Sequence, residues 1–156
     1  MAQEINVKEW LWRYRQAKLN VRRLQGEYEE LASVQESVGA VTYDGMPHSG
    51  ENHDLSDLMV MRDRAITNLI KANHRMTVAY DEITEAISML DSEVKRSVIS
   101  LRYIQTKNEY QVNTLADVAE AICYEYSYIR RVHGEALQDL RSIIPQINNH
   151  TKKAVK

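Results

Sequence analysis

The sequence predicts an all-α protein, on the distribution of its helix breakers and on its composition. The chain has 5 Gly and 2 Pro in 156 residues. Four of these seven, Gly39, Gly45, Pro47 and Gly50, fall in one short window. Sandwiches, barrels and doubly wound sheets need turn residues about every dozen positions, so this distribution excludes them. Charged residues make up 27% of the chain, which is typical of long helices.

The first half, residues 1–90, is predicted to be a long antiparallel coiled-coil hairpin with its turn at 39–53. Asn6 and Glu9 have the spacing of a capping box. Apolar residues then recur every three or four positions, the spacing of a heptad seam. The seam residues are Val7, Trp10, Tyr14, Ala17, Val21, Leu24, Tyr28, Leu31 and Val38, then Leu55, Met59, Ile66, Leu69, Met76, Tyr80, Ile83, Ile87 and Leu90. The short turn, with Asp-Gly, Pro and Ser-Gly, implies antiparallel helices.

A second set of apolar residues lies outside this seam. The set is Leu11, Trp12, Ile70 and Val78. We expect it to be buried against another copy, which predicts a homodimer through the hairpin; packing on the C-terminal half is the alternative. His48 and His53 lie in the turn beside acidic residues, but nothing there orients metal ligands. A solvated turn, with no metal and no cofactor, is therefore expected.

Residues 91–145 are predicted to form a helix-turn-helix domain. Asp91 or Ser92 caps a first helix, a polar loop spans 105–113, and Thr114 with Asp117 approximates a capping box for a short second helix. The inner faces of these helices are Val94, Val98, Leu101 and Ile104, then Leu115, Val118, Ala119 and Ile122. A third helix starts near Glu125, buries Ile129, Val132, Ala136, Leu137 and Leu140, and ends before Pro145. Residues 146–156 are predicted to be a disordered basic tail.

Four motifs carry a resemblance to known proteins. Three lie in the C-terminal half and are Thr114-Leu115-Ala116-Asp117-Val118-Ala119-Glu120, Ser100-Leu101-Arg102-Tyr103-Ile104 and Arg131-Val132-His133-Gly134-Glu135-Ala136-Leu137. The hairpin turn adds Tyr43-Asp44-Gly45-Met46-Pro47. These motifs resemble region four of sigma factors and, more closely, small phage-encoded sigma-like transcriptional regulators of the ArpU type. The resemblance implies a DNA-binding transcriptional regulator of phage or prophage genes that contacts promoter-proximal duplex DNA. Cys123 stands where the family usually has glycine, so we expect a right-handed conformation there or a reshaped turn.

The helix that starts near Glu125 carries the predicted base contacts. Its outward set is Tyr126, Ser127, Arg130 and Arg131, and the resemblance implies a DNA-contacting arginine at Arg130. An arginine there can bond guanine O6 and N7. The predicted phosphate contacts are Thr114, Tyr128, Lys107, Arg102 and Arg141.

Other interpretations of these residues remain open. Arg130 and Arg131 suit a solvated helix face that pairs with Glu125 or Glu135. Tyr124 is expected in the core, His133 is expected to pack or cap, and Cys123 is expected to be a small buried residue.

The rest of the sequence narrows the functional classes. Residues 1–90 carry 10 basic and 14 acidic side chains and residues 91–156 carry 10 and 8, which favours the C-terminal half for nucleic-acid contact. Catalytic motifs such as a phosphate loop, GxSxG or HExxH are absent from the sequence, so we expect no enzyme. Without a membrane-length apolar run or a signal peptide, a cytoplasmic protein of the bacterial host cell is expected. RNA polymerase is a candidate partner. The alternatives are a protein-binding adaptor or inhibitor, and a purely architectural coiled coil.

Overall fold

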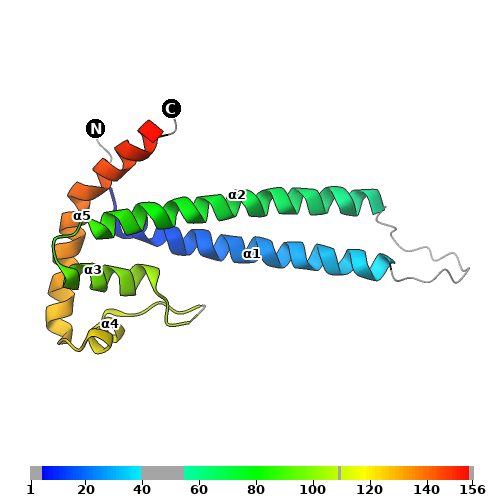
Figure 1. Ribbon diagram of the computed structural model, residues 1–156. Helices are drawn as coiled ribbons and strands as arrows, with labels where there is room; N and C mark the ends of the chain where they lie inside the picture. Colours follow the sequence, from blue (N-terminus) through cyan, green and yellow to red (C-terminus); the bar gives the residue numbers. More distant parts are fainter. Residues whose placement is uncertain (1–4, 40–54, 109, 155–156) are drawn as a thin grey trace, which may run out of the picture. The chain divides into compact units, whose positions relative to one another are not determined.

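The computed structural model describes residues 5–39, 55–108 and 110–154. These residues form five α-helices and one short π-helix, which confirms the all-α prediction (Figure 1). The helices are α1 (Val7–Gly39), α2 (Leu55–Ser88), α3 (Glu93–Ile99), α4 (Leu115–Ile122) and α5 (Tyr126–Ala154), with the π-helix η1 (Ser100–Ile104) following α3 directly. Most of the predicted turn at 39–53, with its family-like motif and its histidines, lies outside the described residues.

The chain separates into two compact units, and the division does not fall at residue 90. Unit 1 comprises residues 1–16 and 76–156, and unit 2 comprises residues 17–75. The grouping of contacts therefore differs from the predicted hairpin and C-terminal segments, whose boundary at residue 90 stays a prediction. The start of α1 and the end of α2 share a hydrophobic core with α5, because both ends carry large apolar residues that a two-helix seam cannot bury alone.

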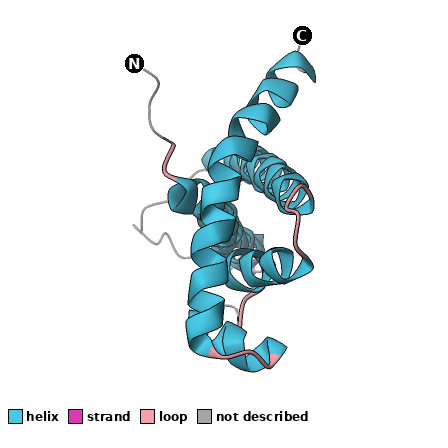
Figure 2. Cartoon of the chain, turned by 90° about the vertical axis from the view of Figure 1, so that its left-hand side faces the viewer, coloured by secondary structure: helices cyan, strands magenta, loops and turns pink. Residues whose placement is uncertain are grey.

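Unit 1 is built on two hydrophobic clusters. The first joins α1, α2, α3 and α5 through the fully buried Leu11, Ile83, Ile99 and Leu140, and it includes the buried Tyr103 of η1. The second lies between α3, α4 and α5, and its buried members are Val98, Val118, Ala119, Ile129 and Val132. Figure 2 shows α5 alongside the other helices of this unit. Leu11 therefore belongs to a core within the chain, and it is not available to a second copy.

The buried seam of α2 differs from the predicted heptad at alternate positions. Met59 is 54% exposed and Tyr80 is 42% exposed. Ile83 and Ile87 are buried as predicted. Buried residues also lie one position before Met59, Tyr80 and Ile87, and they repeat every seven residues as Leu58, Ala72, Ala79 and Ala86, with Ala65 half-buried. Small residues at this spacing let two helix backbones approach closely. Sequence reasoning favoured the larger side chains and missed this alanine repeat.

Helix α5 is longer than predicted. It continues through Pro145 to Ala154, so the prediction of a helix end before Pro145 and of a disordered tail from 146 is wrong. Ile143, Ile144 and Ile147 are buried on the same face of the helix, and their packing offsets the backbone hydrogen bond that the proline removes. Pro145 itself is exposed.

The loop at 105–113 is held by local hydrogen bonds. An isolated antiparallel bridge joins Thr106 to Val112, and the Asn108 side chain accepts hydrogen bonds from the backbone N–H groups of Tyr110 and Gln111 at 3.0 and 2.9 Å. Asn113 donates to the Leu101 carbonyl at 2.9 Å. These hydrogen bonds hold the described residues of the loop, 105–108 and 110–113, between η1 and α4.

Candidate nucleic-acid interface

Helices α4 and α5 form a short helix, a three-residue turn and a long helix. Val118 and Ala119 of α4 pack against Ile129 and Val132 of α5, and these four side chains are 0–5% exposed. Ile129 and Val132 are spaced by three, so the residues between and before them point outward. The first two turns of α5 therefore present a solvent-facing surface on a rigid support.

The base-contact set predicted from sequence lies on this surface. Tyr126 is 52% exposed, and Ser127 and Arg130 are exposed. Arg131 is also exposed, but its Nε lies 3.7 Å from Glu135 Oε1 and its guanidinium lies over the Tyr128 ring at 5.3 Å. Arg131 thus has the i,i+4 pairing expected of a solvated helix face.

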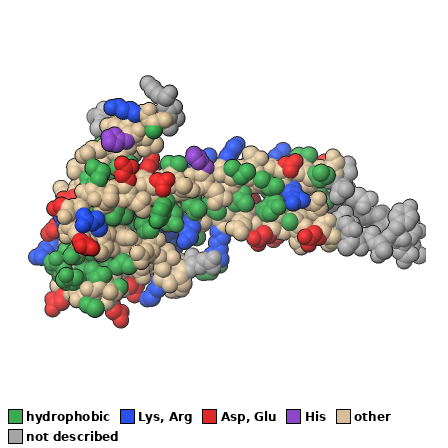
Figure 3. Space-filling view, viewed as in Figure 1, with side chains coloured by type: hydrophobic (Ala, Val, Ile, Leu, Met, Phe, Trp, Pro, Cys, Tyr) green, Lys and Arg blue, Asp and Glu red, His purple; other side chains and the backbone are tan. Residues whose placement is uncertain are grey.

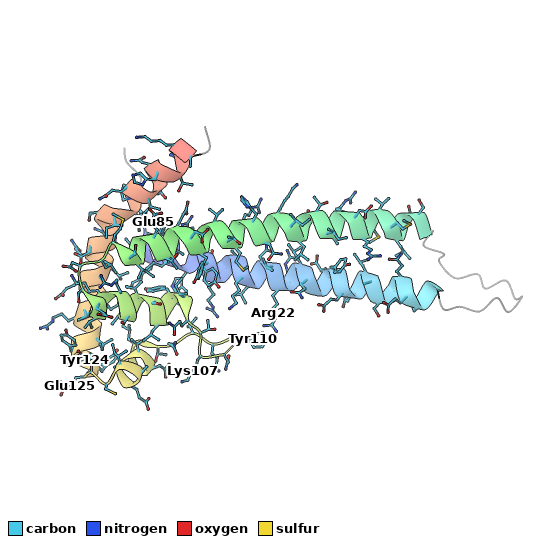
Figure 4. All side chains as sticks on the ribbon, viewed as in Figure 1. Arg22, Glu85, Lys107, Tyr110, Tyr124 and Glu125 are labelled. Carbon is cyan, nitrogen blue, oxygen red and sulfur yellow. The ribbon has the colours of Figure 1, made fainter. Side chains whose placement is uncertain are left out.

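The turn between the helices contains two departures from prediction. Cys123 takes the left-handed conformation, with φ 57° and ψ 42°, and it is exposed. It was expected to be right-handed, or to reshape the turn, and to be buried. It instead closes the C-terminus of α4 as a glycine would, with its N–H bonding to carbonyls of the last turn. Tyr124 is 48% exposed, so its predicted place in the core is also wrong. Figure 4 labels Tyr124 and Glu125 at this turn.

The N-terminus of α4 already holds a carboxylate. Thr114 accepts a hydrogen bond from the Asp117 N–H at 3.2 Å, and Asp117 accepts one from the Thr114 N–H at 2.8 Å, which confirms the capping box. Lys107 Nζ lies 2.8 Å from Asp117 Oδ1. The hydrogen bond from Lys107, followed by those from Thr114, lowers the pKa of Asp117 to about 2. A DNA phosphate at Thr114 or Lys107 would therefore compete with Asp117.

The other three predicted phosphate contacts, Arg102, Tyr128 and Arg141, differ in their exposure and in what they contact. Arg102 donates to the Asn113 carbonyl at 2.6 Å and its guanidinium lies 5.1 Å from the Trp12 ring centre, so it supports the fold. Tyr128 is half-buried beside Tyr124, with ring centres 5.2 Å apart. Arg141 is exposed and lines an open groove of about 370 Å³ together with Lys8 and Gln138.

A buried Tyr–His pair lies behind the interface, and sequence reasoning found only half of it. His133 was expected to pack, and it is 8% exposed. Its Nε2 lies 3.0 Å from the Tyr103 hydroxyl, and Tyr103 also packs on Trp12 at 4.6 Å. Burial, followed by the charges of Lys8 and Arg102, lowers the pKa of His133 to about 4. The signal available in the sequence was the aromatic content of the Leu-Arg-Tyr-Ile motif, but nothing there fixes a partner 30 residues away.

The surface around the turn is mixed in character. Figure 3 shows hydrophobic side chains gathered over α4 and the start of α5, with acidic side chains at the edges of this region. Exposed Glu120 lies in the last turn of α4, and exposed Glu125 lies in the turn itself. The exposed Arg130 and Arg131 follow in α5. Aromatic and arginine side chains suit contact with a nucleic acid or with a protein.

Comparisons of the chain with protein-family models, with curated proteins and with solved structures found no match. Among the residues that the structure describes, none of the helices is long and apolar enough to cross a membrane. Within the same residues, no group of three His, Cys, Asp or Glu side chains is placed to hold a metal ion.

Proposed function

We propose that the protein is a sequence-specific DNA-binding transcriptional regulator of phage or prophage genes, in which α4 and α5 act as a helix-turn-helix. One observation carries the proposal. Ile129 and Val132 are buried against Val118 and Ala119, while Tyr126, Ser127 and Arg130 project from the first turns of α5. A helix-turn-helix uses this face of its second helix to contact base edges in the major groove.

Arg130 is the residue proposed to confer specificity. It is exposed, and it lies on the outward face of the helix that would enter the groove. A guanidinium there can donate two hydrogen bonds to one guanine, which discriminates against other bases by about 1–3 kcal/mol. Arg131 forms an ion pair with Glu135, which neutralises part of its attraction for DNA. We therefore assign Arg131 a supporting role in DNA binding.

Selection of bound DNA from a random duplex library tests this function, with the wild type and Arg130→Ala in parallel. Enrichment of one motif by the wild type, relaxed at one base pair by Arg130→Ala, is the expected result. Gln146→Ala is a matched control, because it removes an exposed polar side chain of the same helix outside the proposed contact set. A library that shows no enrichment at low salt would contradict the proposal.

A protein-binding adaptor or inhibitor is the second candidate function. It is favoured by the exposed Tyr124 and Tyr126 beside Glu120 and Glu125, because acidic residues at the turn weaken attraction for phosphate. Aromatic residues are also enriched in protein interfaces. RNA polymerase is the proposed partner in either case. Recovery of polymerase with the purified protein, lost in Tyr126→Ala and retained in Arg130→Ala, would support the adaptor.

We also propose that the protein is cytoplasmic and that it forms a homodimer through the hairpin. Unit 2 leaves Met59, Ile70 and Leu19 exposed at 54%, 63% and 42%. These exposed apolar side chains favour a contact with another chain, because such a contact would remove them from water. A dimer of helix-turn-helix proteins binds two related half-sites separated by whole turns of the duplex.

A further inference from the structure

The charges of unit 2 are separated along the hairpin. Residues 17–26 and 64–75 contain six Lys or Arg and no Asp or Glu. Residues 27–39 and 55–63 contain six Asp or Glu and one Arg. Both segments belong to the same unit. Two copies aligned head to tail would therefore bring a basic half against an acidic half, whereas a parallel alignment would bring like charges together.

The outer face of α1 repeats this separation at the level of single residues. Its members are Leu19, Arg22, Arg23, Gly26, Glu29, Glu30 and Ser33. Their spacing by three and four places them on one side of the helix, opposite the seam residues Leu24, Tyr28 and Leu31. Arg22 is half-buried and the other six residues are exposed. Figure 4 shows Arg22 on the side of α1 that faces away from α2.

This face is self-complementary about Gly26. Two arginines precede Gly26 by four and three positions, and two glutamates follow it by three and four. We propose that the outer face of α1 binds the same face of a second copy in an antiparallel arrangement, with Gly26 at the two-fold axis. Arg22 then meets Glu30 of the second copy, and Arg23 meets its Glu29. This inference rests on the proposed homodimer and is independent of DNA binding.

Gly26 supplies a separate reason for a close contact at this point. A glycine inside a helix is less favourable than alanine. A Cβ added at Gly26 would meet no atom within 4 Å in the described part of the chain, so packing within the chain does not require glycine. A second helix crossing here would require it, because glycine lets two backbones approach closely.

The side-chain contacts that Arg23 and Glu29 make within the chain are consistent with an exchange of partners. Arg23 bonds Glu27 and Asn20, and Glu29 accepts from Gln25 at 3.2 Å. These contacts are exposed and of the weak i,i+4 or i,i+3 kind. A polyanion is the other occupant that the basic half would suit, but the acidic half of the same unit would repel it. In a self-associated dimer, the basic half of each copy lies against the acidic half of the other, so both charges are paired.

Sedimentation equilibrium of the full chain tests the contact. The wild type is expected to be a dimer, and Gly26→Leu is expected to raise the dimer Kd by about tenfold or more while the melting temperature of the monomer stays level or rises. Asn68→Leu, at an exposed position of α2 outside this face, is the matched control and should leave the Kd unchanged. A monomeric wild type, or a Gly26→Leu dimer as tight as the wild type, would overturn the proposal.

Charge reversal separates the second copy from a polyanion. Arg22→Glu with Arg23→Glu should weaken the dimer by about tenfold. Adding Glu29→Arg and Glu30→Arg to the same chain should restore it, because each reversed pair finds its reversed partner. If the four substitutions together restore nothing, and the first two abolish binding to a nonspecific DNA duplex, the basic half serves a polyanion and the proposal is wrong.

Disulfide cross-linking in a Cys123→Ala background establishes the orientation. Leu19→Cys mixed with Ser33→Cys should cross-link. Neither should cross-link with itself, because positions 19 in two antiparallel copies lie 14 residues, or about 21 Å, apart along the helix axis. Self-cross-linking of each variant alone would show a parallel dimer and contradict the antiparallel arrangement. DNA selection with Gly26→Leu shows whether sequence preference persists without the dimer, so failure here is distinguishable from failure of the DNA proposal.

Discussion

The two units of this chain use similar helices but stabilise them differently. Unit 1 contains nearly all of the fully buried side chains, and they pack together across six helical elements. In the described part of unit 2, the buried apolar residues are Leu58 and Ala72. Its seam also admits the half-buried Arg62, which bonds Gln35 at 2.9 Å and Tyr28 at 3.3 Å. Unit 1 therefore derives its stability from burial, and unit 2 from helix formation along one seam.

Truncation of a core leucine in each unit should show this difference most strongly. Leu140→Ala should lower the free energy of unfolding by about 2–5 kcal/mol, because it removes a fully buried side chain and leaves a cavity. Leu69→Ala, in the half-buried seam of unit 2, should cost about half as much or less. Trp10 and Trp12 both belong to unit 1, so tryptophan fluorescence in urea follows that unit, and circular dichroism follows both. Equal losses of unfolding free energy in the two variants would contradict the proposed difference between the units.

The pH dependence of unit 1 should be the next largest effect. The pKa of His133 falls from 6.5 to about 4 on folding. Between these two pH values the imidazole is largely protonated in the unfolded chain and largely neutral in the folded chain. The stability from neutral His133 is therefore complete above about pH 6.5 and is lost as pH falls toward 4, by roughly 1–3 kcal/mol. His133→Gln should remove this slope.

Other titratable groups could also contribute to the pH dependence of the unfolding free energy. His74 and His150 are exposed and serve as internal controls through His74→Gln and His150→Gln, which should leave the slope in place. The pKa of Asp91 is lowered by Lys95, and that of Asp117 is about 2, so their titration falls below the window. An unchanged slope in His133→Gln would contradict the assignment.

The capping box of α4 should have an intermediate effect. Asp117→Ala removes the hydrogen bonds to Thr114 and the ion pair with Lys107, and should lower the thermal stability of unit 1 by less than the loss of neutral His133 does. It should also strengthen nonspecific DNA binding, because Lys107 and the helix N-terminus become available to phosphate. Glu120→Ala, at the exposed side of the same helix, controls for the lost charge. Weaker DNA binding in Asp117→Ala would argue against the proposed interface.

The smallest expected effect concerns the turn. Cys123 has a positive φ, which costs an ordinary residue about 1–2 kcal/mol relative to glycine. Cys123→Gly should raise the stability of unit 1 by about 0.5–1 kcal/mol, after the extra entropy of glycine in the unfolded chain is deducted. Cys123→Ala keeps the Cβ and should be close to neutral. A loss of stability in Cys123→Gly, read by thermal melting, would show that the cysteine side chain contributes something the backbone geometry does not explain.

The sequence predicted the helices better than it predicted their faces and ends. Heptad spacing and capping residues located α1, α2 and α4, because both signals are local. The alanine repeat on α2 was missed because alanine is a weak apolar signal beside Met59 and Tyr80. The continuation of α5 past Pro145 was missed because tertiary burial of Ile143, Ile144 and Ile147 outweighs a local helix breaker.

The candidate interface was predictable as a set of exposed residues but not as a set of contacts. The spacing of Ile129 and Val132 placed Tyr126, Ser127 and Arg130 outward. Pairing of Lys107 with Asp117, and of Arg102 with the Asn113 carbonyl, depends on the path of the 105–113 loop, which has no apolar periodicity to predict it. The exposure of Tyr124 follows from the left-handed conformation of Cys123, which the residue type disfavours.

Base recognition by Arg130 is the central claim, and a double-mutant cycle tests it most directly. The free energy of binding would be measured for the wild type and Arg130→Ala, each on the selected duplex and on the same duplex altered at the base pair that Arg130→Ala relaxes. A coupling of about 1–3 kcal/mol between residue and base pair is predicted, because the two hydrogen bonds are lost with either change. Additive losses with no coupling would contradict direct recognition by α5.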